Sequence, residues 1–514
     1  MPIVQQPNWM PGIGNCSIDA LDETLYGLER VSDELMSFIY LPAVLRSVSF
    51  QFYLAIAVLL LGSWFSIGFH QSDEHYQILE FAAMRAGHSP VGDLPWEYAE
   101  QMRPGLQPFM AYVAYRIIGD PFWTTFFLRL LSGAFTLWVA WLVFRRCLPQ
   151  LGQKDWRPWL AGACLLHWAM WYSGLRFSSE SWSGLMFALG YLTYMSLSGK
   201  SSEPARQAHK YLFLSGFCFG LAFCFRYQVG LLVLGFGAWL LFVQREKWLH
   251  LGLIVFGGLF ALALGVLTDY WLYGQWVNAP WNYLAQNLIE GKAATFGTRP
   301  WWGYFELVFL RGIPPLSLLY VLAPLVFFWH HRKHPLTWSW VPFLLIHIVL
   351  SRKDVRFLFP LLPLLPIVLL GAWQVVVVYS EGHVRFKQSS SFTLGSRWRY
   401  LAYLIVLMNL GILAVNAFRP MRPSIAAAEY VYRHLPEDTI LVVPEGRPYV
   451  FYDLPAHFYR REGLQLVSEC PSGVDCYHIL KAKPKEVPSD VRVLWTNRPS
   501  WLPVVGADWY WVVK

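Results

Sequence analysis

The sequence predicts an all-α protein that crosses a membrane many times and ends in a small α/β domain. Of its 514 residues, 55% are hydrophobic and only 14% are charged, whereas roughly a quarter of the residues of a soluble domain are charged. Many apolar runs are long enough, as helices, to cross a hydrocarbon core, which takes roughly 20 residues. The short alternating segments that a membrane barrel needs are absent from the sequence.

The apolar runs predict about eleven transmembrane helices. If the chain starts in the cytoplasm, every second connection is cytoplasmic, and these connections are the richer in Lys and Arg, as the positive-inside rule requires. This orientation leaves a long first loop (70–123), a Trp-rich loop (272–314) and the C-terminal segment on the outer face. The predicted spans lie at about 49–69, 124–144, 158–175, 182–198, 211–224, 229–243, 252–271, 315–329, 338–350, 357–379 and 400–417.

The two ends of the chain differ from the membrane part at 49–417. Within residues 1–48, apolar residues at helical spacing from Ile18 to Tyr40 predict a helix on the cytoplasmic membrane surface, with a disordered tail as an equal alternative for the first dozen residues. Residues 418–514 combine a predicted helix at about 425–435 with short β-prone runs, and we expect them to form a small outer α/β domain. The β-prone runs lie at 440–443, 464–467, 491–495 and 509–513.

The net charge of +8 does not indicate nucleic-acid binding, because the basic residues are scattered through short connections and not clustered with aromatic residues. The lipid bilayer is the partner that the composition predicts. Cys470 and Cys476 could form a disulfide if their segment lies outside. The sequence requires no cofactor and shows no metal-ligand spacing, although the acids described next would tolerate a divalent metal.

Two adjacent carboxylates, Asp73 and Glu74, stand where the first predicted span leaves the membrane. Acids near hydrocarbon cost free energy, so they are candidates for function. One interpretation is a solvated loop whose acids pair with arginines. The other is a general base, because partial dehydration raises the pKa of a carboxylate toward the range that suits removal of a proton from a sugar hydroxyl.

Several cations recur at the outer ends of different predicted spans, against the positive-inside trend. A single arginine could snorkel to the interface, but several on one face indicate an anion site. A lipid-borne phosphate, bound through bidentate arginine contacts, is the natural ligand. Structural ion pairing with nearby acids is the alternative. The candidates are Arg176, Arg226, Arg352, Lys353 and Arg356.

Short motifs follow one another along the chain in an order typical of one enzyme family. They are Asp73-Glu74-His75-Tyr76-Gln77 with Glu80, Pro95-Trp96-Glu97-Tyr98, Arg103-Pro104-Gly105-Leu106-Gln107-Pro108, Asp269 with Tyr273-Gly274-Gln275-Trp276, Phe296-Gly297-Thr298-Arg299-Pro300-Trp301, and Arg352-Lys353-Asp354-Val355-Arg356-Phe357. Together they resemble glycosyltransferase family 22 of the GT-C superfamily, the lipid-phosphate-mannose-dependent mannosyltransferases. The likeness is greatest to the branch that adds the third mannose of glycosylphosphatidylinositol anchors. The chain departs from the family pattern at Pro95, where the family has Thr, and at Gln107 and Arg352, where it has His.

The resemblance implies a GT-C fold and an inverting transfer of mannose from a polyprenyl (dolichyl) phosphate donor to a glycan or glycolipid acceptor. It implies that Asp73 is the base, and that Glu74 and His75 orient it or hold the acceptor. Arg352, Lys353 and Arg356, with Arg176 and Arg226 as further candidates, would neutralise the departing phosphate. The remaining candidates for acceptor binding or loop structure are Gln77, Glu80, Trp96, Glu97 and Arg103.

Two alternatives stay open: the same mechanism with another polyprenyl-phosphate sugar, and a transporter of lipid or sugar. A transporter predicts internal repeats and paired, broken spans, which the sequence lacks. The one Asn-x-Ser/Thr sequon, at Asn15, falls in the predicted cytoplasmic segment. We therefore expect an integral multi-pass protein, with the bacterial plasma membrane slightly favoured over the endoplasmic reticulum membrane.

Overall fold

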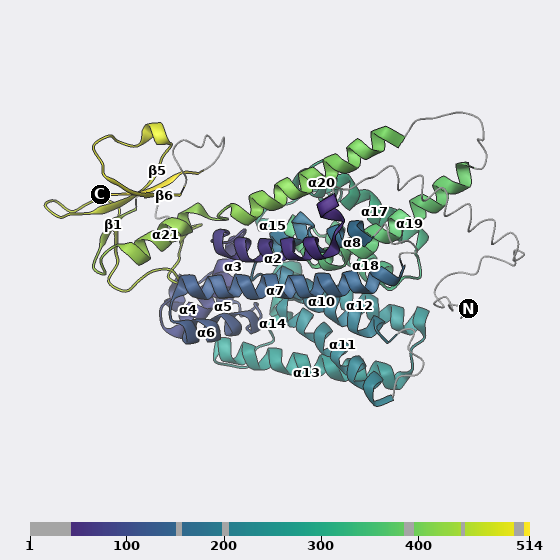
Figure 1. Cartoon of the computed structure of the whole chain (residues 1–514). Coiled ribbons are helices and arrows are strands. Elements are labelled where there is room, and N and C mark those ends of the chain that lie inside the picture. The colour runs from purple at the N-terminus through teal and green to yellow at the C-terminus, as the bar shows by residue number, and fades with distance from the viewer. Residues whose placement is uncertain (1–42, 151–156, 198–204, 385–394, 444–447, 498–507) are drawn as a thin grey trace, which may run out of the picture.

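The long helices of the protein run along a common direction, and a small sheet lies beyond one end of this bundle (Figure 1). The first outer loop, with its short helices, occupies the same end as the sheet (Figure 1). The structure, a computed structural model, describes residues 43–150, 157–197, 205–384, 395–443, 448–497 and 508–514. The predicted surface helix at 18–40 lies outside these ranges.

Within the described ranges, seven helical segments are long and apolar enough to cross a membrane. Two further apolar helices, α17 (Leu316–His330) and α18 (Pro335–Val349), are shorter. Another predicted span, at 182–198, corresponds to α10 (Ser179–Met195). The seven segments are Val48–Phe65, Pro121–Cys147, Arg206–Phe225, Tyr227–Gln244, Trp248–Tyr273, Val355–Val376 and Tyr403–His434.

The prediction of one continuous span at 158–175 was wrong. Two helices occupy this range, α8 (Arg157–Leu165) and α9 (Trp168–Gly174), and they are separated by a break at residues 166–167. The Asn409 side chain satisfies this break, since its Nδ2 donates to the Leu166 carbonyl and its Oδ1 accepts from the Trp168 N–H. A polar side chain from α20 (Gly395–Phe418) thus replaces the backbone hydrogen bonds that hydrocarbon cannot supply.

Small residues bring the helices that carry the outer cations close together. In α11 (Ala205–Phe225), a Cβ on Gly216 would lie 1.8 Å from the Ile254 carbonyl oxygen of α13 (Trp248–Tyr273). In α10, a Cβ on Gly184 would lie 2.5 Å from the backbone of Pro360 in η9 (Val355–Leu364). Backbones approach this closely only where no side chain intervenes. The contacts pack α11 closely against α13 and α10 closely against η9.

The first outer loop folds into short helices between α2 (Val48–Phe65) and α7 (Pro121–Cys147). Helices α4 and α6 each end at a glycine, Gly87 and Gly119, with positive φ of 88° and 77°, a conformation that favours glycine. The loop elements are α3 (Ser72–Glu74), the π-helix η2 (His75–Glu80), α4 (Phe81–Ala86), η3 (Val91–Asp93), α5 (Trp96–Ala99) and α6 (Leu106–Ile118).

The C-terminal part has the predicted α/β composition. Helix α21 (Pro423–His434) precedes a five-stranded sheet of order β4-β1-β5-β7-β6, in which β1 runs parallel to β4 and β5, and β7 runs antiparallel to β5 and β6. The sequence predicted four strands but missed β5 and the β2–β3 hairpin. Cys470 and Cys476 form a disulfide. The strands are β1 (Ile440–Val442), β2 (Val450–Phe451), β3 (Leu454–Pro455), β4 (Gln465–Val467), β5 (Tyr477–Lys481), β6 (Val493–Thr496) and β7 (Tyr510–Val513).

The C-terminal part and the first outer loop share one apolar core. Tyr76 of η2 is buried in this core together with Phe451 and Tyr459. Its hydroxyl lies 3.1 Å from the Phe451 carbonyl oxygen and also contacts the Leu454 carbonyl. Because its buried hydroxyl bonds to backbone carbonyls, the Tyr76 side chain has a fixed orientation relative to the C-terminal part. The β2–β3 hairpin therefore packs on the helical turn that directly follows Asp73 and Glu74.

Candidate active site

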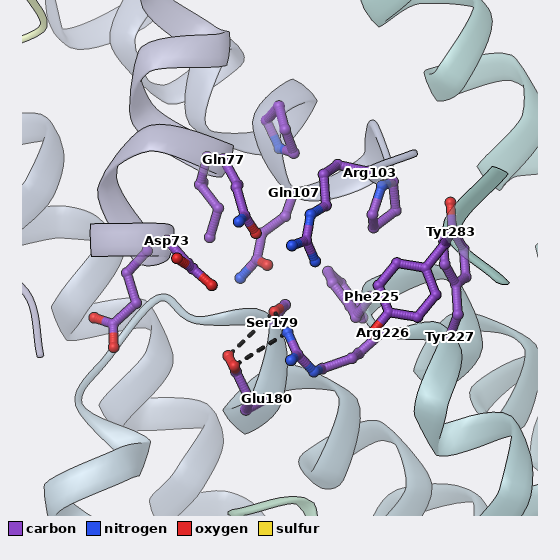
Figure 2. Close-up of a pocket in the computed structure, with 14 residues that line it drawn as sticks. Asp73, Gln77, Arg103, Gln107, Ser179, Glu180, Phe225, Arg226, Tyr227 and Tyr283 are labelled. Atoms are coloured by element: carbon purple, nitrogen blue, oxygen red, sulfur yellow. Dashed lines mark hydrogen bonds and ion pairs between the residues drawn. The ribbon is translucent and has the colours of Figure 1, made fainter. Parts of the chain in front are cut away.

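A cavity lies between the loop at 70–123, predicted to be the first outer loop, the N-terminal end of α10 and the C-terminal end of α11. Figure 2 shows Gln77, Gln107 and Arg103 on the loop side, facing Ser179, Glu180 and Arg226, with Asp73 at one end and Tyr227 and Tyr283 at the other. Tyr283 comes from α14 (Ala279–Leu284) of the Trp-rich loop. The full lining is Asp73, Glu74, Gln77, Ile78, Arg103, Pro104, Gln107, Pro108, Ser179, Glu180, Phe225, Arg226, Tyr227 and Tyr283.

Asp73 and Arg356 form the closest carboxylate–guanidinium contact at this cavity. Oδ2 of Asp73 lies 2.7 Å from Nη1 of Arg356, and the side chains are 29% and 14% exposed. Arg356 stands in the first turn of η9, where its Nε lies 3.2 Å from Asp354 Oδ2 and 3.9 Å from Glu180 Oε1. Arg356 thus lies behind the lining and ties two of its carboxylates together.

The sequence analysis predicted a raised pKa for the carboxylate, but the pKa of Asp73 is lowered. Burial raises the pKa of this carboxyl, but the guanidinium groups of Arg356, Arg103 and Arg226 outweigh burial and hold the pKa below its ordinary value. The general expectation of a raised pKa at a membrane edge was therefore wrong for Asp73, because it neglected the arginines that the fold brings to it. Asp73 is ionised at neutral pH.

The raised pKa belongs to Glu74. Burial raises the pKa of Glu74 to about 7, because attraction to Arg176 only partly offsets burial and the Glu180 carboxylate adds to it. Its Oε2 accepts a 3.3 Å hydrogen bond from the His70 N–H. The pKa values of two adjacent carboxylates are thus shifted in opposite directions, an arrangement that separates acid and base roles in many active sites.

Arg226 connects the ends of the spans to the Trp-rich loop. Its Nη1 lies 3.1 Å from Glu180 Oε1 and donates to Ser179 Oγ at 3.0 Å (Figure 2). Its Nε donates to Gln228 Oε1 at 2.8 Å, and Gln228 Nε2 donates in turn to the Tyr283 hydroxyl at 2.7 Å. This chain of hydrogen bonds links a cation of the cavity to a loop that lies apart from it in the sequence.

Arg103 joins the cations of the cavity, although the sequence suggested an acceptor role. Its Nη2 lies 3.3 Å from Glu97 Oε1, which also accepts from Gln77 Nε2 at 3.2 Å. The Arg103 guanidinium lies over the Tyr283 ring at 5.5 Å from its centroid, a favourable cation–π geometry. Glu97 and Gln77 therefore hold Arg103 in place from behind.

The segment that carries Arg103 and Gln107 is fastened to α13. The N–H of Gly105 donates to Asp269 Oδ1 at 2.6 Å, and the Tyr273 hydroxyl bonds to both the N–H and the carbonyl of Arg103. A Cβ on Gly105 would lie 2.3 Å from the Thr268 carbonyl oxygen. These contacts hold the 103–108 segment against α13.

The five cations predicted to share a phosphate site occupy different places. Arg226 lines the cavity and Arg356 bonds to Asp73. Arg176 donates to the carbonyls of Ser66 and Gly68 at 2.8 Å and borders a second cavity with Glu74. Arg352 donates to the Phe296 carbonyl, and Lys353 donates to the Ile348 and Leu350 carbonyls.

Trp96, another residue singled out from the sequence, stacks on Phe296, and Lys292 lies over the Trp96 ring.

His75 and Glu80 point away from the cavity toward the C-terminal part. They are 0% and 1% exposed, and His75 Nε2 lies 2.7 Å from Glu80 Oε1. Glu80 also accepts from the Phe458 N–H at 2.9 Å and from Ser89 Oγ at 3.0 Å. The His75 ring stacks between Phe69 and Tyr459. Of the two roles expected for each residue, this burial favours loop structure for Glu80 and orientation of the base for His75 over direct contact with an acceptor.

The lining also contains residues that the sequence analysis did not name, among them Ser179, Tyr227 and Tyr283. Tyr227 follows Arg226, a predicted cation. Phe458 and Tyr459, which contact Glu80 and His75 from the C-terminal part, carried no signal in the sequence. Within the described ranges, no group of three or more His, Cys, Asp or Glu side chains is placed to hold a metal ion.

Known proteins resemble this chain in sequence and in fold. A model of the Alg9-like mannosyltransferase family matches residues 50–439. GPI alpha-1,2-mannosyltransferase 3 of Xenopus laevis is 25% identical over 306 residues, which cover 57% of this chain and 54% of that protein. The Homo sapiens protein of the same name is 27% identical over 313 residues (57% and 51%), and alpha-1,2-mannosyltransferase ALG9 of Mus musculus is 27% identical over 253 residues (44% and 40%). The chain spans about half the length of the first two relatives.

The crystal structure of ArnT from Cupriavidus metallidurans bound to undecaprenyl phosphate shares the fold. It superimposes with a TM-score of 0.50 at 12% identity, covering 91% of this chain and 97% of ArnT. At this identity the likeness concerns the fold alone. Together with the helical composition and the strand-containing C-terminal part, it confirms the predicted GT-C fold.

Proposed function

Because this chain belongs to the Alg9-like mannosyltransferase family, we propose that it moves mannose from a polyprenyl phosphate carrier to a hydroxyl of a glycan or glycolipid. The observation that carries the proposal is the ionised Asp73 carboxylate, which borders a cavity with Arg103 and Arg226 and contacts Arg356. An inverting transfer needs a base on one side of the anomeric carbon and positive charge on the other. The relatives named as alpha-1,2-mannosyltransferases support the same reaction.

In the proposed reaction Asp73 accepts the proton of the acceptor hydroxyl. The oxygen of that hydroxyl bonds to the anomeric carbon while the bond from this carbon to the phosphate oxygen breaks. The bonding electron pair leaves with the polyprenyl phosphate, and a β-linked donor gives an α-mannoside. The lowered pKa of Asp73 keeps the carboxylate free of a proton, but it also reduces its basicity, because a general base works best with a pKa near the operating pH.

In this scheme Arg356 can pair with two anions, the Asp73 carboxylate and the donor phosphate. In the structure it pairs with Asp73, and that pairing weakens Asp73 as a base, since an adjacent cation lowers the pKa of a carboxyl. A donor phosphate that draws Arg356 toward itself releases this restraint at the moment when the leaving group is in place. Binding of the donor would thereby strengthen the base, with Arg226 and Arg103 as the other phosphate candidates.

The protein is a multi-pass membrane protein, and we propose that the reaction takes place on its outer or lumenal face. The first outer loop contacts the Trp-rich loop through a hydrogen bond from Asn282 Nδ2 to the Glu100 carbonyl, and the C-terminal part through a hydrogen bond from the Phe458 N–H to Glu80. The curated relatives described above are eukaryotic, and the preference for a bacterial plasma membrane has no support from them. An endoplasmic reticulum membrane is the alternative that fits these relatives.

Transfer by the purified full chain in lipid nanodiscs tests the proposal. The assay supplies radiolabelled dolichyl or undecaprenyl phosphate mannose with candidate glycolipid acceptors, and compares wild type with Asp73→Asn. We expect the substitution to reduce transfer at least 100-fold, the usual scale for loss of a general base. Glu100→Gln, an exposed acid of the same loop that bonds to Gln286, is the matched control. Transfer by Asp73→Asn at the wild-type rate would remove Asp73 as the base.

A further inference from the structure

The Gln107 side chain is buried at the cavity without a hydrogen-bond partner. It is 2% exposed, and neither its Nε2 nor its Oε1 has a partner among the described residues. Figure 2 shows its amide between Asp73 and Arg103, directed toward the side that carries Ser179 and Glu180. A primary amide offers two donor hydrogens and two acceptor lone pairs. Burial of such a group with none of them used is costly, and native proteins rarely tolerate it.

Two acidic side chains at and directly behind the lining already bond to other groups. Glu97 Oε1 accepts from both Gln77 and Arg103, and Asp73 Oδ2 pairs with Arg356. The backbone segment that carries Gln107 is also held in place. Gly105, two residues earlier, is bonded to Asp269 and packs against Thr268. The fold therefore holds an unsatisfied amide at a fixed position at the cavity.

A second unsatisfied group belongs to Tyr227, at the end of the cavity away from Asp73 (Figure 2). The Tyr227 hydroxyl is buried and has no partner among the described residues, and Tyr227 lines the same cavity. Pro104, Pro108 and Phe225 add apolar surface to the lining. The combination of neutral hydrogen-bonding groups and apolar surface differs from that of a phosphate site, which uses cations. It matches a sugar ring, which has hydroxyls on its rim and C–H groups on its faces.

We propose that Gln107 and Tyr227 form a subsite that binds ring hydroxyls of a sugar and so determines which sugar the cavity accepts. The proposal rests on the function proposed above and adds the residues that recognise the ring. The ring can belong to the donor or to the acceptor, since both carry the same hydroxyl chemistry. A site built to hydrogen-bond a hydroxyl rejects a ligand that lacks it, because its own buried groups are then left unpaired.

Steady-state transfer by full-length protein in nanodiscs tests this subsite with Gln107→Leu, Gln107→Glu and Tyr227→Phe. We expect Gln107→Leu to raise the KM of one substrate about 10-fold, the factor for one lost hydrogen bond of ordinary strength, and to leave the KM of the other unchanged. A rise for the donor assigns the ring to the donor, and a rise for the acceptor assigns it to the acceptor. Tyr227→Phe, which removes one hydroxyl, should raise the same KM. Gln286→Leu, outside the lining, is the matched control.

Deoxy sugars separate recognition from a merely structural effect. For a substrate that lacks the recognised hydroxyl, wild type and Gln107→Leu should have the same KM, because the hydrogen bond is already absent. KM values within twofold of wild type for both substrates in Gln107→Leu and Tyr227→Phe would overturn the subsite. An equal rise of both KM values that persists with the deoxy substrates would also overturn the subsite.

Thermal unfolding gives a readout that needs no transfer. Methyl α-mannoside at high concentration should raise the unfolding midpoint of wild type and not that of Gln107→Leu. Absence of transfer by wild type with every donor would contradict the proposed function, while this mannoside shift would still support the subsite. If wild type transfers the sugar but Gln107→Leu changes neither KM value nor the mannoside-induced shift of the unfolding midpoint, the subsite alone is overturned.

Discussion

The carboxylate of Glu80 lies 2.7 Å from the imidazole of His75, and both side chains are almost completely buried. The same carboxylate accepts the N–H of Phe458 from the C-terminal part. Because η2, which contains both residues, directly follows Asp73 and Glu74, this pair joins the C-terminal part to the segment that carries the proposed base. The C-terminal part is thus positioned to determine where Asp73 stands.

Glu80→Ala should destabilise the protein by at least about 1–3 kcal/mol, because it leaves buried hydrogen-bonding groups of His75, Phe458 and Ser89 without their acceptor. The pKa of Glu80 lies below its ordinary value of 4.5: burial opposes this, but His75, the Phe458 N–H and Ser89 outweigh burial. The stabilisation should therefore be complete above about pH 4.5 and disappear as the pH falls through the lower pKa of the folded state. Thermal unfolding of wild type and variant across this range measures it. A pH-independent difference between them would contradict the prediction.

Arg356→Ala should raise the KM of the donor more than that of the acceptor, by roughly 10- to 100-fold, because it removes a cation from the proposed leaving-group side. It also removes the contact that holds down the pKa of Asp73, so the acid limb of the pH–rate profile should move to higher pH. Steady-state kinetics with each substrate varied supplies both measurements.

Arg352→Ala is the informative comparison for Arg356→Ala. The Arg352 side chain is not among the residues that line the cavity and bonds to the Phe296 carbonyl, so a smaller effect on the KM of the donor is expected. Equal effects of the two substitutions would favour the single phosphate site that the sequence predicted.

Glu74→Gln should stabilise the protein at alkaline pH. Burial raises the pKa of Glu74 from 4.5 to about 7 in the folded state, so folding favours the protonated form and wild-type stability should fall as the pH rises from about 4.5 to 7. Removal of the titrating group should recover about 1–3 kcal/mol above pH 7 and nothing near pH 4.5. Unfolding midpoints at pH 4.5 and pH 8 check this. A gain of the same size at both pH values would show that titration is not the cause.

Gly105→Ala should cost at least about 1–3 kcal/mol, the range for overpacking. The new Cβ would lie 2.3 Å from the Thr268 carbonyl oxygen and 2.9 Å from the Asp269 nitrogen, both of them backbone atoms. The displacement should also reduce transfer, because Arg103 and Gln107 flank this residue. Gly92→Ala, in the same loop with open space around its Cβ, is the control. Wild-type stability and transfer in Gly105→Ala would contradict the close packing.

The sequence was most informative for structural properties that depend on residues close together along the chain. It predicted the membrane helices and the β-prone runs, which follow from hydrophobic length and period. It failed at 158–175, where Asn409, a residue of a distant helix, satisfies the break. It also singled out Asp73, Glu97 and Arg103 as site candidates, and these residues now lie around one cavity or directly behind it. It did not predict that His75 and Glu80 face another part of the chain.

The sequence by itself determined that this is a polytopic helical membrane protein with a short α/β end, and its motif order led to the mannosyltransferase family. Only the tertiary structure decided which ionisable groups meet. Asp73 and Glu74 are neighbours of the same chemical type, yet the pKa of one falls and that of the other rises. The reason is that electrostatic energies depend on distance and on burial. Arg356 acquires its distance to Asp73 only when η9 packs against α10, far along the chain from the first outer loop.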